Sequence, residues 1–101
     1  MIIAKEHIRG ADSILSLCDK ELIGKKFEEA GLQLDLTSNF YKGEEKTKDE
    51  LRKIVPKFRI VNAVGHKSVN LLLEFGLVEK DRIIAIKEIP HAQCVNEDYH
   101  Q

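Results

Sequence analysis

The sequence has no tryptophan, only two cysteines and few aromatic side chains. Aromatic residues make up 6% of the chain, which leaves few side chains for binding nucleic acid by extensive base stacking. Cys18 and Cys94 are too few and too far apart for a disulfide scaffold or a paired-cysteine metal motif. No apolar run approaches the roughly 20 residues that a membrane-spanning helix needs. These absences argue against a disulfide-rich or membrane protein and favour a cytoplasmic protein with reduced cysteines.

Length and hydrophobic content predict one domain. Of the 101 residues, 43% are hydrophobic, which is enough for one core but not for a second domain. The sequence has no internal repeats and no low-complexity stretches. We predict a single α+β domain over residues 1–95 and a flexible carboxyl-terminal tail over residues 96–101.

The net charge of -1 hides an uneven distribution of charged residues. Residues 42–67 include eight Lys and Arg against four Asp and Glu, a net charge of +4, which leaves -5 for the rest of the chain. Such a segment either binds a polyanion or is a solvated surface of a lysine-rich protein. The residues that we consider for contact with RNA are Lys46, Lys53, Lys57 and Arg59.

Patterns in the first half predict strands, a helix and a polar loop. Residues 2–8 and 13–18 are predicted as a hairpin of two strands. Asp19 is placed to cap a helix over residues 20–30, whose apolar side chains recur at helical spacing. Strict alternation then predicts a strand over residues 32–36. Next, Phe40 and Tyr41 stand in a polar loop, as a contact surface or as a lid on the core.

The second half predicts two further helices and the remaining strands. The predicted elements are a helix from a Thr47 capping box to a stop before Pro56, a central strand over residues 58–64, a buried helix over residues 66–75 that Gly76 ends, and a strand over residues 83–89. Together the elements predict a two-layer α+β sandwich with a mixed sheet of about five or six strands and three helices.

The most suggestive motif is Gly65-His66-Lys67-Ser68, where a buried strand is predicted to enter a helix. The amino end of a helix presents backbone NH groups and a partial positive charge, which can hold a phosphate or a carboxylate. Lys67 would add a charge and Ser68 a hydroxyl group. In a nucleotide-binding P-loop a first glycine stands five positions before the second, and counted from Gly65 this chain has Ile60 there, so nucleotide hydrolysis by this motif is excluded. The motif is therefore an anion site or an ordinary strand-to-helix turn.

The second candidate site is Pro90-His91-Ala92-Gln93, which is predicted to interrupt the last strand. His91 is a candidate general acid or base, and Gln93 would orient a ligand. Alternatively, His91 is a structural hydrogen-bonding residue. Catalysis would need a carboxylate beside His91, and the candidates are Glu28, Glu29 and Asp35.

A metal site is the third candidate. His91 and Cys94 stand three residues apart, and His7, His66 or Cys18 could complete a set of ligands. Zinc sites usually have two paired ligand motifs, whereas this chain has one irregular pair. We therefore predict neither a metal site nor a cofactor.

Several short blocks, spread over nearly the whole chain, form a distinctive combination. They are Cys18-Asp19, Leu22 to Glu29, Leu34-Asp35-Leu36, Phe40-Tyr41, Asn62-Ala63-Val64-Gly65, Gly76-Leu77-Val78 and Ile89-Pro90-His91-Ala92-Gln93. In combination they resemble the archaeal family catalogued as domain of unknown function 424. The resemblance implies an archaeal cytosolic protein with a compact two-layer α+β fold and no established activity, and it draws attention to Gly65 and residues 90–93. His66 stands where members of the family would have an acid, which makes the turn more cationic.

These observations favour a non-enzymatic binding or accessory protein, either monomeric or homodimeric. In this interpretation it contacts RNA or a translation-related partner through the basic segment and the Gly65 turn, and phosphate contacts would make the binding steeply dependent on salt. One alternative is a small enzyme that uses His91 near the Gly65 turn. Another is a homodimer or partner-interaction module that uses Phe40, Tyr41 and an edge strand. The position of His91 relative to Gly65 distinguishes the binding protein from the enzyme.

Overall fold

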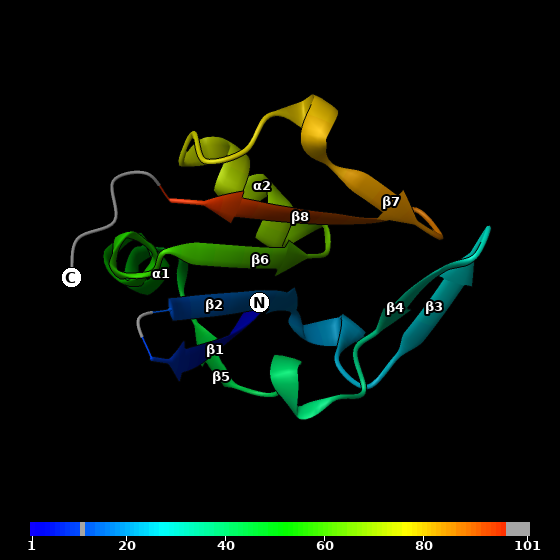
Figure 1. Ribbon diagram of the computed structural model, residues 1–101, viewed down its shortest axis with the longest axis horizontal. Coiled ribbons are helices and arrows are strands. Elements are labelled where there is room, and N and C mark those ends of the chain that lie inside the picture. The colour runs from blue at the N-terminus through cyan, green and yellow to red at the C-terminus, as the bar shows by residue number, and fades with distance from the viewer. Residues whose placement is uncertain (11, 97–101) are drawn as a thin grey trace.

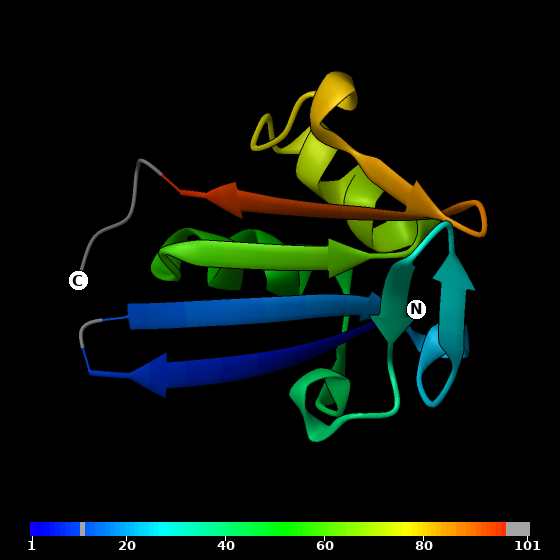
Figure 2. The same ribbon diagram turned by 45° about the vertical axis from the view of Figure 1, so that its right-hand side comes forward.

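The computed structural model describes residues 1–10 and 12–96. A six-stranded sheet with the order β5-β1-β2-β6-β8-β7 lies at its centre, and β3 and β4 form a separate two-stranded hairpin. The two α-helices pack on one face of the sheet, while the hairpin stands at the end of the sheet where β2 and β6 end (Figures 1 and 2). The predicted α+β class and the mixed sheet are confirmed.

The chain passes through its elements in the following order. They are β1 (Ile2–Arg9), β2 (Asp12–Asp19), the 3-10 turn η1 (Lys20–Leu22), β3 (Lys26–Glu29), β4 (Leu32–Asp35), η2 (Asn39–Tyr41), β5 (Glu44–Lys46), α1 (Lys48–Ile54), η3 (Val55–Lys57), β6 (Ile60–Val64), α2 (His66–Glu74), η4 (Lys80–Arg82), β7 (Ile84–Ile86) and β8 (Ile89–Val95). The described residues thus contain two α-helices, and the prediction of three is wrong.

The prediction of a helix over residues 20–30 fails because this segment forms η1 and then the first strand of the β3–β4 hairpin. Ala30 and Gly31 have φ values of 50° and 84°, and two successive residues with positive φ make the tight turn that a hairpin needs. Apolar residues at helical spacing, including Leu22 and Phe27, instead pack in a core cluster beside the hairpin. Local spacing therefore gave the wrong element here.

The strands predicted over residues 2–8, 13–18 and 58–64 are confirmed, with small shifts of their ends. β1 and β2 are antiparallel along their whole length. β6 is parallel to β2 on one side and antiparallel to β8 on the other, which gives it the predicted central position. Apolar residues cover both of its faces because Val61 and Ala63 pack in the larger core cluster and Val64 in the smaller one.

The last predicted strand is also corrected. A turn at Lys87 and Glu88, with φ values of 52° and 65°, divides it into β7 and β8, and β8 continues without interruption through Pro90. Pro90 is tolerated because the last pair of β6 and β8 is Val64 with His91, so no strand needs the missing NH group. Its carbonyl accepts a 2.9 Å hydrogen bond from the Gly65 NH group.

Both helices predicted in the second half are confirmed. At α1, the Thr47 hydroxyl accepts from the Glu50 NH group at 3.1 Å, and the Glu50 carboxylate accepts from the Thr47 NH group at 3.0 Å. At the end of α2, Gly76 has a φ of 73° and the Leu77 NH group donates to the Leu72 carbonyl at 2.9 Å. This is the predicted Schellman ending.

Two apolar clusters lie on opposite faces of the sheet. The larger one, between the sheet and the helices, includes Leu15, Leu17, Leu51, Val61 and Leu72. The smaller one lies toward the hairpin and consists of Cys18, Leu22, Leu34, Leu36, Val64 and Ile86, with Tyr41 packed against it. The Phe40 ring stacks on the His7 ring at 4.2 Å. The aromatic loop is therefore a lid on the core.

The end of the described chain differs from the predicted tail. Asn96 is buried, and its NH group donates to the Arg59 carbonyl at 2.7 Å. Residues 97–101, the rest of the predicted tail, lie outside the described residues. No helix in the described ranges is long and apolar enough to cross a membrane.

Candidate functional site

The Gly65 turn holds a carboxylate of the protein itself. One oxygen of Asp19, the last residue of β2, accepts from the Lys67 NH group at 3.0 Å, and the other accepts from the NH and hydroxyl groups of Ser68, both at 2.8 Å. Only 3% of Asp19 is exposed. Asp19 thus stands at the amino end of α2, where the helix favours an anion. The expectation that this turn presents free NH groups is wrong for Lys67 and Ser68.

The arrangement requires glycine at position 65. Gly65 has a φ of 104°, and an added Cβ atom would lie 2.3 Å from the Cγ atom of Asp19. Asp19 reaches this turn because β2 and β6 are parallel neighbours whose last pair is Cys18 with Val64, so the next residues of both strands lie side by side. Sequence reasoning found Asp19 but assigned it to the wrong helix, because the pairing of β2 with β6 was not known.

His91 lies near Gly65 along the sheet, but its side chain lies on the other face. It pairs with Val64, which packs in the cluster toward the hairpin. Asp19 and α2 lie on the face with the larger cluster, where Ala63 and Ala92 pack. The sheet therefore separates the His91 side chain from the Gly65 turn, and the two candidate places form no common site.

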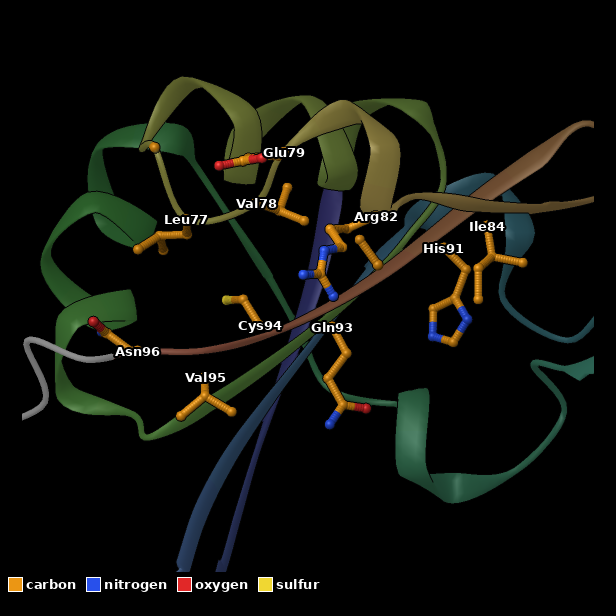
Figure 3. Close-up of a pocket in the computed structure, with 12 residues that line it drawn as sticks. Leu77, Val78, Glu79, Arg82, Ile84, His91, Gln93, Cys94, Val95 and Asn96 are labelled. Carbon is orange, nitrogen blue, oxygen red and sulfur yellow. The ribbon is translucent and has the colours of Figure 1, made fainter.

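His91 and Gln93 line a groove of about 890 Å³ beside β8 (Figure 3). The other wall is the segment that follows α2, together with Arg82 of η4. Figure 3 shows Leu77, Val78 and Glu79 on one side of β8 and Gln93 and Val95 on the other, with the Arg82 guanidinium group reaching toward the strand. The lining consists of Gly76, Leu77, Val78, Glu79, Arg82, Ile84, His91, Ala92, Gln93, Cys94, Val95 and Asn96.

The groove follows a stretch of β8 that lacks a neighbouring strand on one side. The pairing of β7 with β8 ends at Ile84 and His91, whereas the pairing of β6 with β8 continues to Val95. Pro90 and Asn96 form their backbone hydrogen bonds on the β6 side, and in an antiparallel ladder the direction of these groups alternates along the strand. The backbone groups of Gln93 and Val95 therefore point into the groove, with no strand partner there in residues 1–10 and 12–96.

Burial keeps the His91 imidazole neutral. Desolvation lowers the pKa of His91 from its ordinary value. Among the described residues, its Nε2 atom is buried without a hydrogen-bond partner, and so is the Oδ1 atom of Asn62 on the adjacent strand β6. The floor of the groove therefore includes a neutral histidine whose hydrogen-bonding capacity is incompletely used.

Neither cysteine is a reactive thiol. Burial raises the pKa of the Cys18 thiol to about 12, and it also raises the pKa of Cys94. His91 and Cys94 project from opposite faces of β8, since their positions differ by an odd number. In the part of the chain that the structure describes, no group of three or more His, Cys, Asp or Glu side chains could hold a metal ion.

The carboxylates considered as partners of His91 lie elsewhere. Glu28, Glu29 and Asp35 belong to the β3–β4 hairpin and do not line the groove. Hydrogen bonds from the Thr37 hydroxyl and then from the Thr37 NH group to the Asp35 carboxylate lower the pKa of Asp35. The acid in the groove is Glu79, which the sequence did not single out.

Carboxylates within and outside the basic segment, residues 42–67, form ion pairs with some of its cations. Lys46 lies 3.3 Å from a carboxylate oxygen of Glu44, and Arg59 donates to Asp12 at 2.8 Å. These two pairs involve half of the cations proposed to contact RNA. The other two, which have no ion pair among the described residues, are Lys53 and Lys57.

Comparison with known proteins identifies relatives and a shared fold. Residues 6–96 match the family described as "Protein of unknown function (DUF424)". No curated protein matches the chain. The chain is similar to the crystal structure of an uncharacterized conserved protein from Methanopyrus kandleri, with a TM-score of 0.77, 24% identity and coverage of 99% of this chain and 97% of that chain. At this identity the likeness shows the fold alone.

Proposed function

Because the chain belongs to the DUF424 family, whose description assigns no function, we propose a function from its geometry: it is a non-enzymatic binding module whose ligand occupies the groove along β8. One observation carries the proposal. His91 and Gln93, both predicted ligand-binding residues, line this groove, whereas Lys67 and Ser68 already bind Asp19. We also propose that the protein is archaeal, which the organism of the similar structure supports, and cytoplasmic, in keeping with two buried free cysteines.

The chemistry of the groove favours binding over catalysis. His91 is the candidate acid or base there, but burial disfavours its charged form, and no described carboxylate is hydrogen-bonded to it. The Cys94 thiol is buried with a raised pKa, so it is a poor nucleophile. The groove therefore supplies polar and apolar contacts without an activated group.

A protein partner has more support than RNA. Arg82 in the groove is accompanied by Glu79, so the groove has no excess of positive charge for a phosphate backbone. In the basic segment, Lys46 and Arg59 already have carboxylate partners. A homodimer built on Phe40 and Tyr41 has less support as well, because both rings pack within the chain.

Ligand mapping by NMR tests the location of the site. Isotope-labelled protein is titrated with mixed peptides, mixed RNA oligonucleotides and small metabolites, and we expect shifts at the backbone amides of residues 76–82 and 91–96. Gln93→Trp should fill the groove and abolish these shifts. Gln33→Trp, an exposed position on β4, is the matched control and should leave them unchanged.

Two outcomes would contradict the proposal. Shifts confined to Lys53 and Lys57 with RNA, lost as salt rises, would place the binding site on the basic segment. Conversion of a metabolite by the wild type but not by His91→Gln would show an enzyme.

A further inference from the structure

We propose that the partner in the groove is an extended polypeptide segment that adds a strand to β8 beside Gln93 and Val95. The inference rests on the proposed function, that the groove is the binding site, and it names the class of partner. The segment belongs to another protein and is held by backbone hydrogen bonds.

The hydrogen-bonding groups at this edge of β8 match those of another extended backbone. Gln93 and Val95 each direct an NH and a carbonyl group into the groove, since β7 ends at the pair of Ile84 with His91. Regularly spaced donors and acceptors of this kind are complementary to another extended backbone. β6 supports the other side of this stretch as far as Val95, so the edge is held in extended form before a partner arrives. The free stretch of β8, residues 92–95, is long enough to pair with an added strand of about four residues.

The two edges of the sheet differ in the charged residues that they carry. At the opposite edge, β5 covers β1 over Ile2, Ile3 and Ala4, and β1 continues with the charged residues Lys5 and Glu6. Charged side chains commonly protect a sheet edge from pairing with other chains. The free stretch of β8, residues 92–95, has no charged residue. The free stretch of β8 therefore carries no protecting charge of its own, and the charged residues beside it, Glu79 and Arg82, belong to the other wall of the groove.

Apolar surface lies on both sides of this edge. Ile84 and Val95 are 55% and 58% exposed, and both line the groove. Across the strand, Leu77 and Val78 are partly buried and line the groove. Alternate residues of an added strand point to opposite faces. A segment with apolar residues at successive positions would contact Val95 and Ile84 with one set of side chains and Leu77 and Val78 with the other.

A selection experiment with matched variants tests the proposal. Peptides are selected from a phage-displayed random library on the wild-type protein and are then measured on Gln93→Pro and Gln93→Ala. Gln93→Pro removes the NH group that points into the groove but no hydrogen bond to β6, and β8 already contains Pro90. Gln93→Ala keeps the NH group. Val95→Pro removes the second donor and serves as the replacement if Gln93→Pro does not fold.

The expected result has two parts. Selected peptides should bind Gln93→Pro at least about tenfold more weakly than the wild type, as loss of a backbone hydrogen bond predicts, and should bind Gln93→Ala nearly as well as the wild type. In hydrogen exchange, the amides of Gln93 and Val95 should exchange quickly in the free protein, unlike those of Ala92 and Cys94, and should become protected when a peptide binds.

Other results would overturn the inference. If no peptide is selected, or if selected peptides bind Gln93→Pro as well as the wild type and leave Gln93 and Val95 unprotected, the partner is not an added strand. If a small molecule or RNA nevertheless shifts the groove amides, the groove is still the binding site, but its ligand is not an added polypeptide strand. If no ligand of any class shifts the groove amides, both the proposed binding site and the proposed added strand are wrong.

Discussion

Replacement of Asp19 by alanine tests the claim that β2 caps α2. The Asp19 carboxylate accepts three hydrogen bonds, from the Lys67 NH group and from the NH and hydroxyl groups of Ser68. Ser68 is fully buried, so water cannot easily replace the carboxylate there. Asp19→Ala therefore removes the helix cap and leaves buried donors without an acceptor.

The size of the effect follows from these contacts. Each unpaired buried donor costs about 1–3 kcal/mol, and loss of a helix cap costs about 0.5–2 kcal/mol. Both figures count some of the same bonds, so we expect Asp19→Ala to lower the free energy of unfolding by about 3–4 kcal/mol. The variant should still fold, because natural domains are stable by about 5–15 kcal/mol.

A double-mutant cycle with Gly65 isolates the contact itself. Gly65→Ala places a Cβ atom 2.3 Å from the Cγ atom and 2.7 Å from the Cβ atom of Asp19, and it also strains the backbone. Once Asp19 is alanine, the contact with Cγ disappears, whereas the contact with Cβ and the strain remain. Urea unfolding followed by circular dichroism should show the double variant to be more stable than the sum of the single effects predicts, by about 1–3 kcal/mol. Gly24→Ala, with a φ of 87° and nothing near the added atom, is the matched control for backbone strain. Additive effects of Asp19→Ala and Gly65→Ala, within about 0.5 kcal/mol, would refute the reasoning.

Three further predictions concern the helices and the groove. Phosphate should raise the melting temperature of Asp19→Ala more than that of the wild type, because the variant frees NH groups at the start of α2. Equal increases in melting temperature would contradict the claim that the Asp19 carboxylate occupies this anion-binding position in the wild type. Thr47→Ala should lower the free energy of unfolding by about 1 kcal/mol through loss of the capping box at α1, measured in urea, and an unchanged midpoint would contradict it. The folded pKa of His91 lies below the ordinary value of 6.5, so below that pH the unfolded chain takes up the proton first and stability falls. The wild type should therefore lose stability relative to His91→Gln as the pH falls from 6.5 toward the folded pKa, and parallel pH profiles would disprove this.

Local signals in the sequence were sufficient where one short segment determines the structure. The capping box of Thr47 and Glu50 and the glycine ending of α2 depend on residues within a turn of each other. The strand predicted from alternation over residues 32–36 is present as β4 for the same reason. The helix predicted over residues 20–30 failed because Phe27 and its apolar neighbours fit helical spacing, while the Ala30 and Gly31 turn depends on pairing between β3 and β4.

The candidate site was predicted only in part. His91 and Gln93 stood out by residue type, and the structure places both along the groove. Glu79 and Arg82 complete the groove from a segment that had no recognisable motif. The free edge of β8 could not be predicted, because it exists only where β7 ends while β6 continues.

The sequence by itself determined the α+β class, most strands, both helices of the second half and the glycine at the Gly65 turn. Only the tertiary structure decided what that turn binds. Hydrophobic alternation specifies which residues are buried, but it does not specify which strands are neighbours. The parallel pairing of β2 with β6 brings Asp19 to the start of α2, and the short β7 leaves the edge of β8 beside Gln93 open.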